Sequence, residues 1–286
     1  MSIAVTGATG RYGRKAIDAL LRQGVPADQI VAIGRNSEKL AGLADLGVVT
    51  CRADYGDPTG LDAALVGVDK LLLVSGNEVG ARLQQHRNVV DAAVRAGVHL
   101  IAYTSAPKAD TSPLLIAPDH KATEAYIRDS GLPFVFLRNS WYLANYTDRA
   151  AAYVDSGVVP GAAGDGRVSA ATHADYADAA ASVLTGAGHA NAVYELGGDQ
   201  AFTMTEFAQA LSEASGKDVE YHDMPKDEYI GLLQTFGFPR EVAEVFADGD
   251  LGVARGDLYV ETGDLGRLIG RPTTTMQAAV AAALGS

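Results

Sequence analysis

The chain has 286 residues, of which 48% are hydrophobic and 20% charged, a balance typical of a globular protein with a sizeable core. The formal net charge of −12 argues against nucleic acid or an anionic membrane as the main partner, and the single Cys51 excludes an intramolecular disulfide. No Cys/His cluster has zinc spacing, no signal peptide opens the chain, and no run approaches the ~18 apolar residues of a membrane span, so we expect a cytoplasmic protein without a metal.

The N-terminal stretch combines a short strand, a glycine turn and a helix. An apolar run at 3–5 leads into three regularly spaced glycines, and an amphipathic helix is expected at 14–21. In a dinucleotide site such glycines allow a tight turn, a close approach to the phosphates and close helix–strand packing, while the helix N-terminus attracts the anion. A surface turn also collects glycine, but the position directly after a strand favours a nucleotide site. The residues assigned to this site are Gly7, Ala8, Thr9, Gly10, Arg11, Tyr12 and Gly13.

The first half of the chain alternates strands with helices. Further strands are expected at 30–33, 48–52, 70–74, 99–104 and 133–138. Helices are expected at 37–46, 61–65, 82–96 and 123–129. This alternation predicts the α/β class, with a Rossmann-like, doubly wound parallel sheet that binds its ligand at the carboxyl ends of the strands.

The second half follows a different pattern. It predicts helices at 139–157, 173–185, 203–215, 226–236, 240–248 and 276–284, strands at 192–196 and 219–221, and glycine turns at 158–168. Thr203 and Glu206 form a capping box at the start of one helix. We therefore divide the chain into a cofactor-binding Rossmann domain at 1–140 and a smaller α/β substrate-side region at 141–286, which is interleaved with the first domain's sheet.

The end of the second predicted strand indicates which dinucleotide binds. Sheets that bind NAD usually carry Asp or Glu there, but this strand runs into Gly34, Arg35 and Asn36. A guanidinium pairs well with a 2′-phosphate because its charge is fixed and its donors form a fork. We therefore expect NADP(H), with Lys39 or Arg11 assisting. The alternative is that Arg35 is a solvated loop charge.

Further cofactor residues are expected where the third, fourth and fifth strands end. Asp54 is placed to accept from the adenine amino group and Tyr55 to pack on the ring, although an ordinary Asp turn explains the pair as well. A small residue after the fourth strand lets the backbone pass the nicotinamide ribose. Hydroxyls after the fifth strand hold the nicotinamide or only form a turn. The residues assigned in this way are Asp54, Tyr55, Ser75, Gly76, Asn77, Thr104 and Ser105.

Several longer motifs resemble those of one protein family. They are Thr6-Gly-Ala-Thr-Gly10, Gln85-His-Arg-Asn88, Arg138-Asn-Ser-Trp-Tyr142, Gly161-Ala-Ala-Gly-Asp-Gly166 and Gly270-Arg-Pro-Thr-Thr-Thr275. Together they are similar, over nearly the whole chain, to the NmrA-like atypical short-chain dehydrogenases/reductases, and most of all to bacterial members that reduce quinones or triphenylmethane dyes. The resemblance implies an NADPH-bound Rossmann domain, a small C-terminal domain and an active cleft between them.

The chain departs from the wider superfamily at one motif. Ordinary short-chain dehydrogenases use Tyr-x-x-x-Lys before the sixth strand, but here Ile116 takes the Tyr place and His120 the Lys place, with Lys121 one residue off. Ketone reduction needs a matched proton donor, whereas a quinone accepts hydride readily and water can supply the proton. The departure fits an easily reduced acceptor, and it equally fits a protein without catalysis.

The catalytic candidates lie mainly after the sixth strand. Asn139 is expected to hydrogen-bond the nicotinamide carboxamide or the substrate oxygen, and Tyr142 to wall a flat aromatic substrate by stacking. All four residues of this stretch, Asn139, Ser140, Trp141 and Tyr142, are also assigned to cofactor binding. The alternative for Trp141 is packing in the core. His120 is the best-placed group to donate a proton near neutral pH, the alternative being a histidine bonded to a loop carbonyl.

Two functions of different classes remain open from the sequence. The first is an oxidoreductase that transfers hydride from NADPH to quinones or similar aromatic acceptors. The second is a non-catalytic NADP(H)-binding redox sensor that regulates a protein partner. The aromatic cluster after Asn139 favours the enzyme. The physiological acceptor and the oligomeric state, a homodimer included, stay open.

Overall fold

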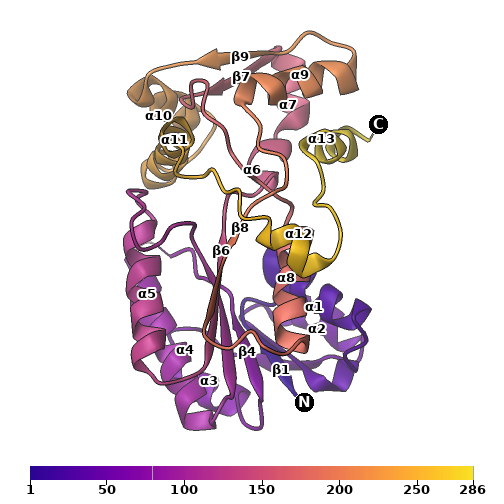
Figure 1. Ribbon diagram of the computed structural model, residues 1–286, viewed down its shortest axis with the longest axis vertical. Helices are drawn as coiled ribbons and strands as arrows, with labels where there is room; N and C mark the ends of the chain where they lie inside the picture. The colour runs from indigo at the N-terminus through magenta and orange to yellow at the C-terminus, as the bar shows by residue number, and fades with distance from the viewer. Residues whose placement is uncertain (79, 286) are drawn as a thin grey trace. The chain divides into compact units, whose positions relative to one another are not determined.

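The computed structural model describes residues 1–78 and 80–285, which form two compact units that interleave along the chain (Figure 1). The first unit comprises Met1–Ala109, Asp119–Asn139 and His173–Tyr194. The second comprises Asp110–Pro118, Ser140–Thr172 and the chain from Glu195 onward. The segment from His173 to Tyr194 lies in the first unit, although the segments on both sides of it lie in the second.

A seven-stranded sheet forms the frame of the first unit, in the order β3-β2-β1-β4-β5-β6-β8. Its strands are β1 (Ile3–Val5), β2 (Ile30–Gly34), β3 (Val49–Arg52), β4 (Lys70–Leu73), β5 (Leu100–Ser105), β6 (Phe134–Asn139) and β8 (Ala192–Leu196). The pairs from β3 through β6 are parallel. The strand order reverses between β1 and β4, which makes their carboxyl ends the expected ligand position.

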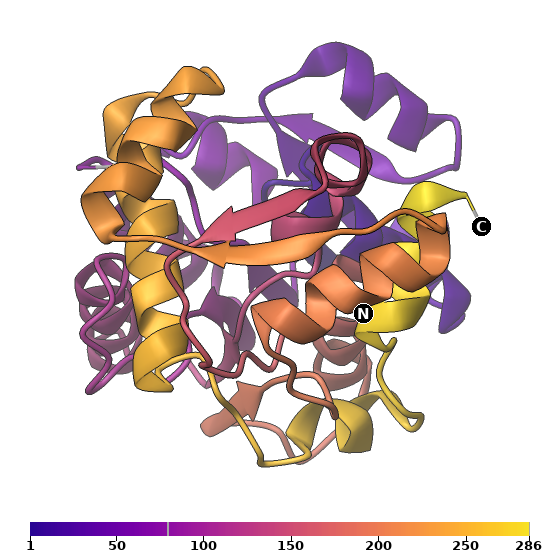
Figure 2. The same ribbon diagram turned by 90° about the horizontal axis from the view of Figure 1, so that it is seen from above.

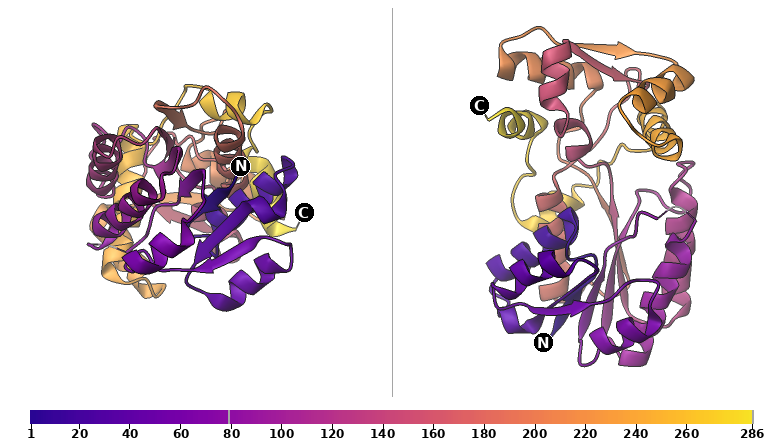
Figure 3. Two further views of the ribbon diagram at one scale, coloured as in Figure 1. Left: turned by 90° about the horizontal axis from the view of Figure 1, so that it is seen from below. Right: turned by 180° about the vertical axis from the view of Figure 1, so that it is seen from behind.

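Helices cover both faces of this sheet (Figure 3). On one face α1 (Arg11–Arg22) packs against α8 (His173–Thr185), and α2 (Ser37–Ala44) lies on the same side. The opposite face carries α3 (Pro58–Ala64), α4 (Arg82–Ala96) and α5 (Ala117–Asp129). A short turn of 3-10 helix, η1 (Ala27–Gln29), precedes β2. The doubly wound α/β fold predicted from the sequence is confirmed.

The middle of the sheet forms where it does because its strands β1, β2 and β4 are almost continuous apolar runs. Val89 and Val90 of α4 are fully buried together with Leu71 and Leu73 of β4 and Ile101 of β5. Fully burying one such side chain stabilises the fold by roughly 1.5–3 kcal/mol. A strand buried on both faces is typical of a parallel sheet, which explains why these runs do not alternate with polar residues.

The second unit contains a two-stranded parallel sheet with helices around it (Figure 2). Its elements are β7 (Val158–Gly161), β9 (Glu220–Asp223), α6 (Ala144–Thr147), α7 (Ala150–Ser156), α9 (Met204–Ser215), α10 (Lys226–Thr235), α11 (Arg240–Arg255), α12 (Asp264–Ile269) and α13 (Met276–Leu284). One core cluster gathers around Phe207, Leu211 and Tyr146, and a smaller one joins Leu233 of α10 to Ala243 and Ala247 of α11.

Several element boundaries differ from the sequence-based expectation. Helix α3 begins earlier than expected because the Asp57 side chain accepts from the Gly60 N–H at 3.1 Å, with Pro58 at the first helical position. The segment 139–157 holds two short helices, α6 and α7, instead of one. The strand β7 lies where only turns were expected, and α12 and the early start of α5 were missed.

The extension of α11 to Arg255 has a packing reason. Gly249 and Gly252 resemble turn signals in the sequence, but both lie inside the helix. A Cβ atom at Gly249 would lie 2.8 Å from the Trp141 ring, and one at Gly252 would lie 2.5 Å from Leu114. The glycines therefore permit close contact with two neighbouring side chains rather than ending the helix.

Residues 1–78 and 80–285 contain no helix that is long and apolar enough to cross a membrane. No group of three or more His, Cys, Asp or Glu side chains in these residues is arranged to hold a metal ion.

Candidate cofactor and active site

The turn between β1 and α1 has the geometry that a dinucleotide phosphate requires. Gly7 has a positive φ of 59°, a conformation that favours glycine. A Cβ atom at Gly13 would lie 2.3 Å from the Gly7 carbonyl oxygen, so a side chain there would push α1 away from the turn. The Gly10 N–H closes the turn on the same carbonyl oxygen at 2.9 Å. The turn at Gly7 and the close packing at Gly13 agree with the roles expected of these two glycines, and the approach of Gly10 to the phosphates stays a prediction.

The N-terminus of α1 is suited to an anion. Its N-cap is Gly10, which provides no side-chain cap. The first-turn N–H groups and the positive end of the helix dipole therefore face the position where a phosphate binds in this fold. Ala8 and Tyr12 are buried, and the Tyr12 hydroxyl donates to the Tyr176 carbonyl at 3.1 Å, so those two side chains serve packing. Arg11 is exposed.

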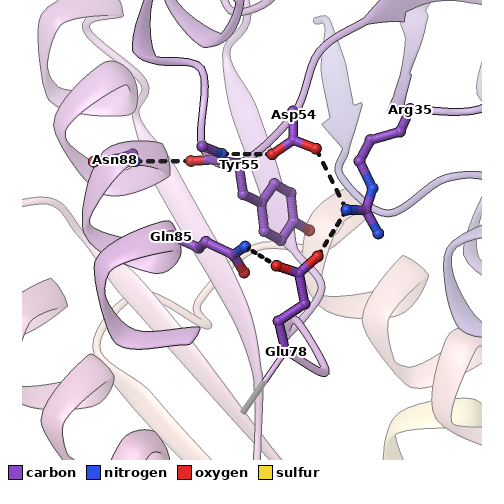
Figure 4. Close-up of polar contacts among 7 residues, drawn as sticks. Arg35, Asp54, Tyr55, Glu78, Gln85 and Asn88 are labelled. Atoms are coloured by element: carbon purple, nitrogen blue, oxygen red, sulfur yellow. Dashed lines mark hydrogen bonds and ion pairs between the residues drawn. The ribbon is translucent and has the colours of Figure 1, made fainter. Parts of the chain in front are cut away.

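Arg35 lies at the end of β2, where it contacts two carboxylates (Figure 4). Its Nη1 donates to Oε1 of Glu78 at 2.7 Å and reaches Oδ2 of Asp54 at 3.4 Å. The hydrogen bond to Glu78, and then the charge of Asp54, raise the pKa of the Arg35 guanidinium above its ordinary value. The sequence contained the Arg35 signal but gave no indication of Glu78, because that contact joins two distant loops.

Asp54 and Tyr55 occupy the end of β3. Oδ1 of Asp54 accepts from the Gly56 N–H at 2.7 Å, which is the Asp turn considered as the alternative. The Tyr55 hydroxyl donates to the Val74 carbonyl at 2.7 Å and lies 2.6 Å from Oγ1 of Thr6. Burial raises the pKa of this phenol, which stays protonated. Tyr55 therefore ties together the ends of β1, β3 and β4, and its contact with adenine stays a prediction.

Side chains of α4 hold the backbone that follows β4. Nε of Arg82 donates to the Gly76 carbonyl at 2.7 Å, and the Gly76 N–H donates to Nε2 of His86 at 2.9 Å. Gln85 donates to Oε2 of Glu78 at 2.6 Å. Arg82, Gln85 and His86 have the spacing that places side chains on one helix face. One turn of α4 thus fixes the backbone N–H and the backbone carbonyl of Gly76, and it also fixes the Glu78 carboxylate.

The hydrogen bonds of His86 define its protonation. Thr123 gives its hydroxyl proton to the Asp119 carbonyl at 2.8 Å, so Nδ1 of His86, 2.9 Å from the Thr123 hydroxyl oxygen, must be the donor to it. Nε2 is then the acceptor for the Gly76 N–H. Burial, and then the charge of Arg82, lower the pKa of His86 to about 3, which keeps the imidazole neutral in this arrangement. Sequence reasoning did not find this positioning role.

Strand β5 ends in Thr104 and Ser105, the two residues whose hydroxyls are expected to contact the cofactor. Oγ1 of Thr104 accepts from the Ser75 N–H at 2.8 Å and donates to the Ser75 hydroxyl at 3.2 Å. Ser105 instead donates to Oε1 of Glu124 at 2.7 Å. Thr104 therefore positions the segment that holds Ser75, Gly76 and Asn77, while the Ser105 hydroxyl is directed into the interior.

His120 does not have the environment of a proton donor at neutral pH. It is buried on α5, and its Nδ1 lies 2.8 Å from the Tyr103 hydroxyl. Burial, and then the charge of Arg82, lower its pKa to about 3. The expectation that His120 donates near neutral pH is not supported, because loss of hydration disfavours the charged imidazolium.

The stretch after β6 divides between the two units. Asn139 is buried at the end of β6 in the first unit. In the second unit the Ser140 hydroxyl donates to the Leu258 carbonyl at 2.9 Å, and the half-buried Trp141 packs against the core around Phe207. Tyr142 is half-buried and forms an isolated parallel β-bridge with Ala171. Ser140 and Trp141 thus have structural contacts, and the catalytic assignments of Asn139 and Tyr142 stay predictions.

The parallel sheet, the glycine turn and the α1 N-terminus define a Rossmann-type dinucleotide-binding protein. The model of the NmrA-like family matches residues 1–250. The chain belongs to the NmrA-like family.

Relatives of known activity match nearly the entire chain. Quinone oxidoreductase 2 of Escherichia coli (strain K12) is 49% identical over 278 residues, which are 97% of each chain. The crystal structure of an NADPH-dependent quinone oxidoreductase from Escherichia coli, complexed with NADPH, has 48% identity and a TM-score of 0.95, covering 99% of this chain and 100% of that one. Citrobacter sp. triphenylmethane reductase complexed with NADP(H) has 41% identity and a TM-score of 0.94, with coverage of 99% and 100%.

Proposed function

We propose that this protein is an oxidoreductase that transfers hydride from NADPH to quinones or similar easily reduced aromatic acceptors. The observation that carries the proposal is the 49% identity to quinone oxidoreductase 2 across 97% of both chains. The glycine turn before α1 supports it independently, because its geometry suits a dinucleotide.

The residues of the first unit fit NADP(H) in three places. The backbone from Gly7 to Gly13 and the first-turn N–H groups of α1 hold the pyrophosphate. Arg35 holds the 2′-phosphate, which a guanidinium binds through charge-assisted hydrogen bonds. The peptide of Gly76, fixed by α4, positions the nicotinamide ribose.

The bound cofactor supplies a hydride, and the chain supplies orientation rather than strong acid catalysis. His86 and His120 are both neutral at pH 7, and the place of the usual catalytic Tyr is taken by Ile116. A quinone requires no strong acid, because water protonates the hydroquinone anion. Replacing His120 with Gln should therefore lower quinone reduction by less than about tenfold, below the ~10²-fold of a true general acid.

Asn139 and Tyr142 are the residues we assign to the acceptor. Asn139 provides an amide that can hydrogen-bond a quinone oxygen, and Tyr142 provides an aromatic face for a flat ring. Stacking of this kind contributes about 0.5–1.5 kcal/mol beyond area burial, which favours aromatic acceptors.

The experiment that tests the function is stopped-flow oxidation of NADPH by a small benzoquinone. Rapid, saturable oxidation with hydroquinone as the product is expected. If NADPH binds but is not oxidised by benzoquinone or a triphenylmethane dye, the redox-sensor function replaces the enzymatic one.

We place the activity in the cytoplasm, where reduced thiols such as Cys51 persist.

A further inference from the structure

Glu78 has both carboxylate oxygens occupied at the edge of the proposed cofactor site (Figure 4). Oε1 accepts from Arg35 at 2.7 Å, and Oε2 accepts from Gln85 of α4 at 2.6 Å. Helix α4 also holds the preceding Gly76 peptide through Arg82 and His86. The Glu78 carboxylate is therefore held beside Arg35 by a chain of contacts that starts on a rigid helix.

Arg35 consequently has an internal anion as its partner. Its side chain is 63% exposed and that of Glu78 is 44% exposed, so the pair is accessible to a ligand. Asp54, at 3.4 Å from the same Nη1 atom, adds a second negative charge. A 2′-phosphate that bonds to Nη1 of Arg35 must displace Glu78 from that donor, and a phosphate held by the other guanidinium donors still meets the charge of both carboxylates. The 2′-hydroxyl of NADH carries no charge and does not need Arg35.

We propose that Glu78 is a specificity-determining residue that competes with the 2′-phosphate of NADPH for Arg35 and thereby lowers the preference for NADPH over NADH. The inference rests on the proposed role of Arg35 in cofactor binding. Glu78 acts as an internal substitute for the phosphate, so part of the affinity that Arg35 provides is lost in breaking the existing ion pair.

Removing the charge of Glu78 should therefore strengthen NADPH binding selectively. Exposed ion pairs contribute up to about 1 kcal/mol, so Glu78→Gln should tighten the Kd of NADPH about three- to fivefold and change that of NADH less than about twofold. Titration by cofactor fluorescence measures both constants without turnover. Glu213→Gln is the matched control, because Glu213 is also an exposed glutamate bonded to a glutamine, Gln209 at 2.9 Å, and should leave both constants unchanged.

The double variant separates competition from simple charge repulsion. If Glu78 acts by occupying Arg35, Glu78→Gln in an Arg35→Ala background should change NADPH affinity by less than about twofold. A full effect in that background would mean that repulsion alone operates and would overturn the inference. Weaker NADPH binding by Glu78→Gln, or equal changes for NADPH and NADH, would overturn it as well.

The Arg35→Ala single variant distinguishes failure of this inference from failure of its premise. A lower ratio of NADPH to NADH affinity supports Arg35 as the phosphate ligand, whatever Glu78→Gln does. An unchanged ratio removes the premise and with it the competition. Neither result depends on whether the protein reduces quinones, because both are binding measurements.

Discussion

Glu124 and Arg138 form a buried, two-point ion pair in the first unit. Nε and Nη2 of Arg138 donate to the two carboxylate oxygens at 2.9 and 2.6 Å, and both side chains are almost fully buried. The Ser105 hydroxyl donates to the same carboxylate at 2.7 Å. The pair therefore joins α5 to the carboxyl ends of β5 and β6, next to Asn139.

Breaking this pair should strongly destabilise the protein. Glu124→Ala leaves the Arg138 charge buried without its carboxylate, which costs about 3–5 kcal/mol in the free energy of unfolding. Urea denaturation measures the change, and Glu213→Ala on the exposed face of α9 should cost less than about 0.5 kcal/mol. Similar losses for the two variants would contradict the structural role of the pair.

The two buried histidines should make the protein less stable in mild acid. Their pKa values are lowered from 6.5 to about 3 in the folded state, so the unfolded chain binds more protons between these values. Stability is then complete above pH ~6.5 and falls toward pH ~3, by at most about 1.4 kcal/mol per pH unit for each histidine. Urea unfolding at several pH values should show a shallower slope in His120→Gln. An unchanged slope would mean that His120 is not neutral in the folded state.

Asp250 should oppose this trend. Burial raises its pKa from 3.8 to about 7, although the Ala162 N–H, which donates to it at 2.9 Å, lowers the value. Its contribution to stability is present below pH ~3.8 and is lost as the pH rises through 7. The Asp250→Asn variant lacks this contribution from protonation. The free energy of unfolding of the variant should therefore fall more steeply than that of the wild type as the pH drops from 7 to 4. Parallel pH profiles would show that Asp250 titrates normally.

Alanine substitutions at two glycines of the turn between β1 and α1 should have different effects. The change at Gly13 should lower stability, and the change at Gly10 should weaken NADPH binding. A methyl group at Gly13 would lie 2.3 Å from the Gly7 carbonyl oxygen, so Gly13→Ala should cost about 1–3 kcal/mol of stability. At Gly10 the same group would lie 3.3 Å from the same oxygen, and the proposed site puts the phosphates beside this residue, so Gly10→Ala should raise the NADPH Kd at least tenfold while costing about 1 kcal/mol or less. Thermal unfolding and fluorescence titration distinguish the two. Equal NADPH affinity in Gly10→Ala and wild type would place the phosphates elsewhere.

Loss of the aromatic ring of Tyr142 should change the KM for the acceptor and leave the affinity for NADPH unchanged. Tyr142→Ala should raise KM for benzoquinone about three- to tenfold, because a stacking contact is lost, and leave the NADPH Kd unchanged. Tyr142→Phe keeps the ring and should behave like the wild type. Loss of NADPH affinity in Tyr142→Ala would assign this residue to the cofactor site instead.

The sequence by itself determined the frame of the first unit and the position of its ligand turn. The expected bounds of α4, with Gly97 beyond its end, and the capping box of Thr203 and Glu206 agree with the structure, since these signals depend on neighbouring residues. The spacing of Gly7, Gly10 and Gly13 likewise predicted a local turn. Arg35 was identifiable because it replaces an acid at a fixed place in the sheet.

Only the tertiary structure decided what the polar side chains do. Glu78 contacts Arg35, and His86 accepts from the Gly76 N–H, because a loop and a helix face meet after the chain has folded. The same packing removes water from His120 and makes its imidazole neutral. No local pattern contains these outcomes, since hydrogen-bond partners and desolvation depend on residues far apart in the chain.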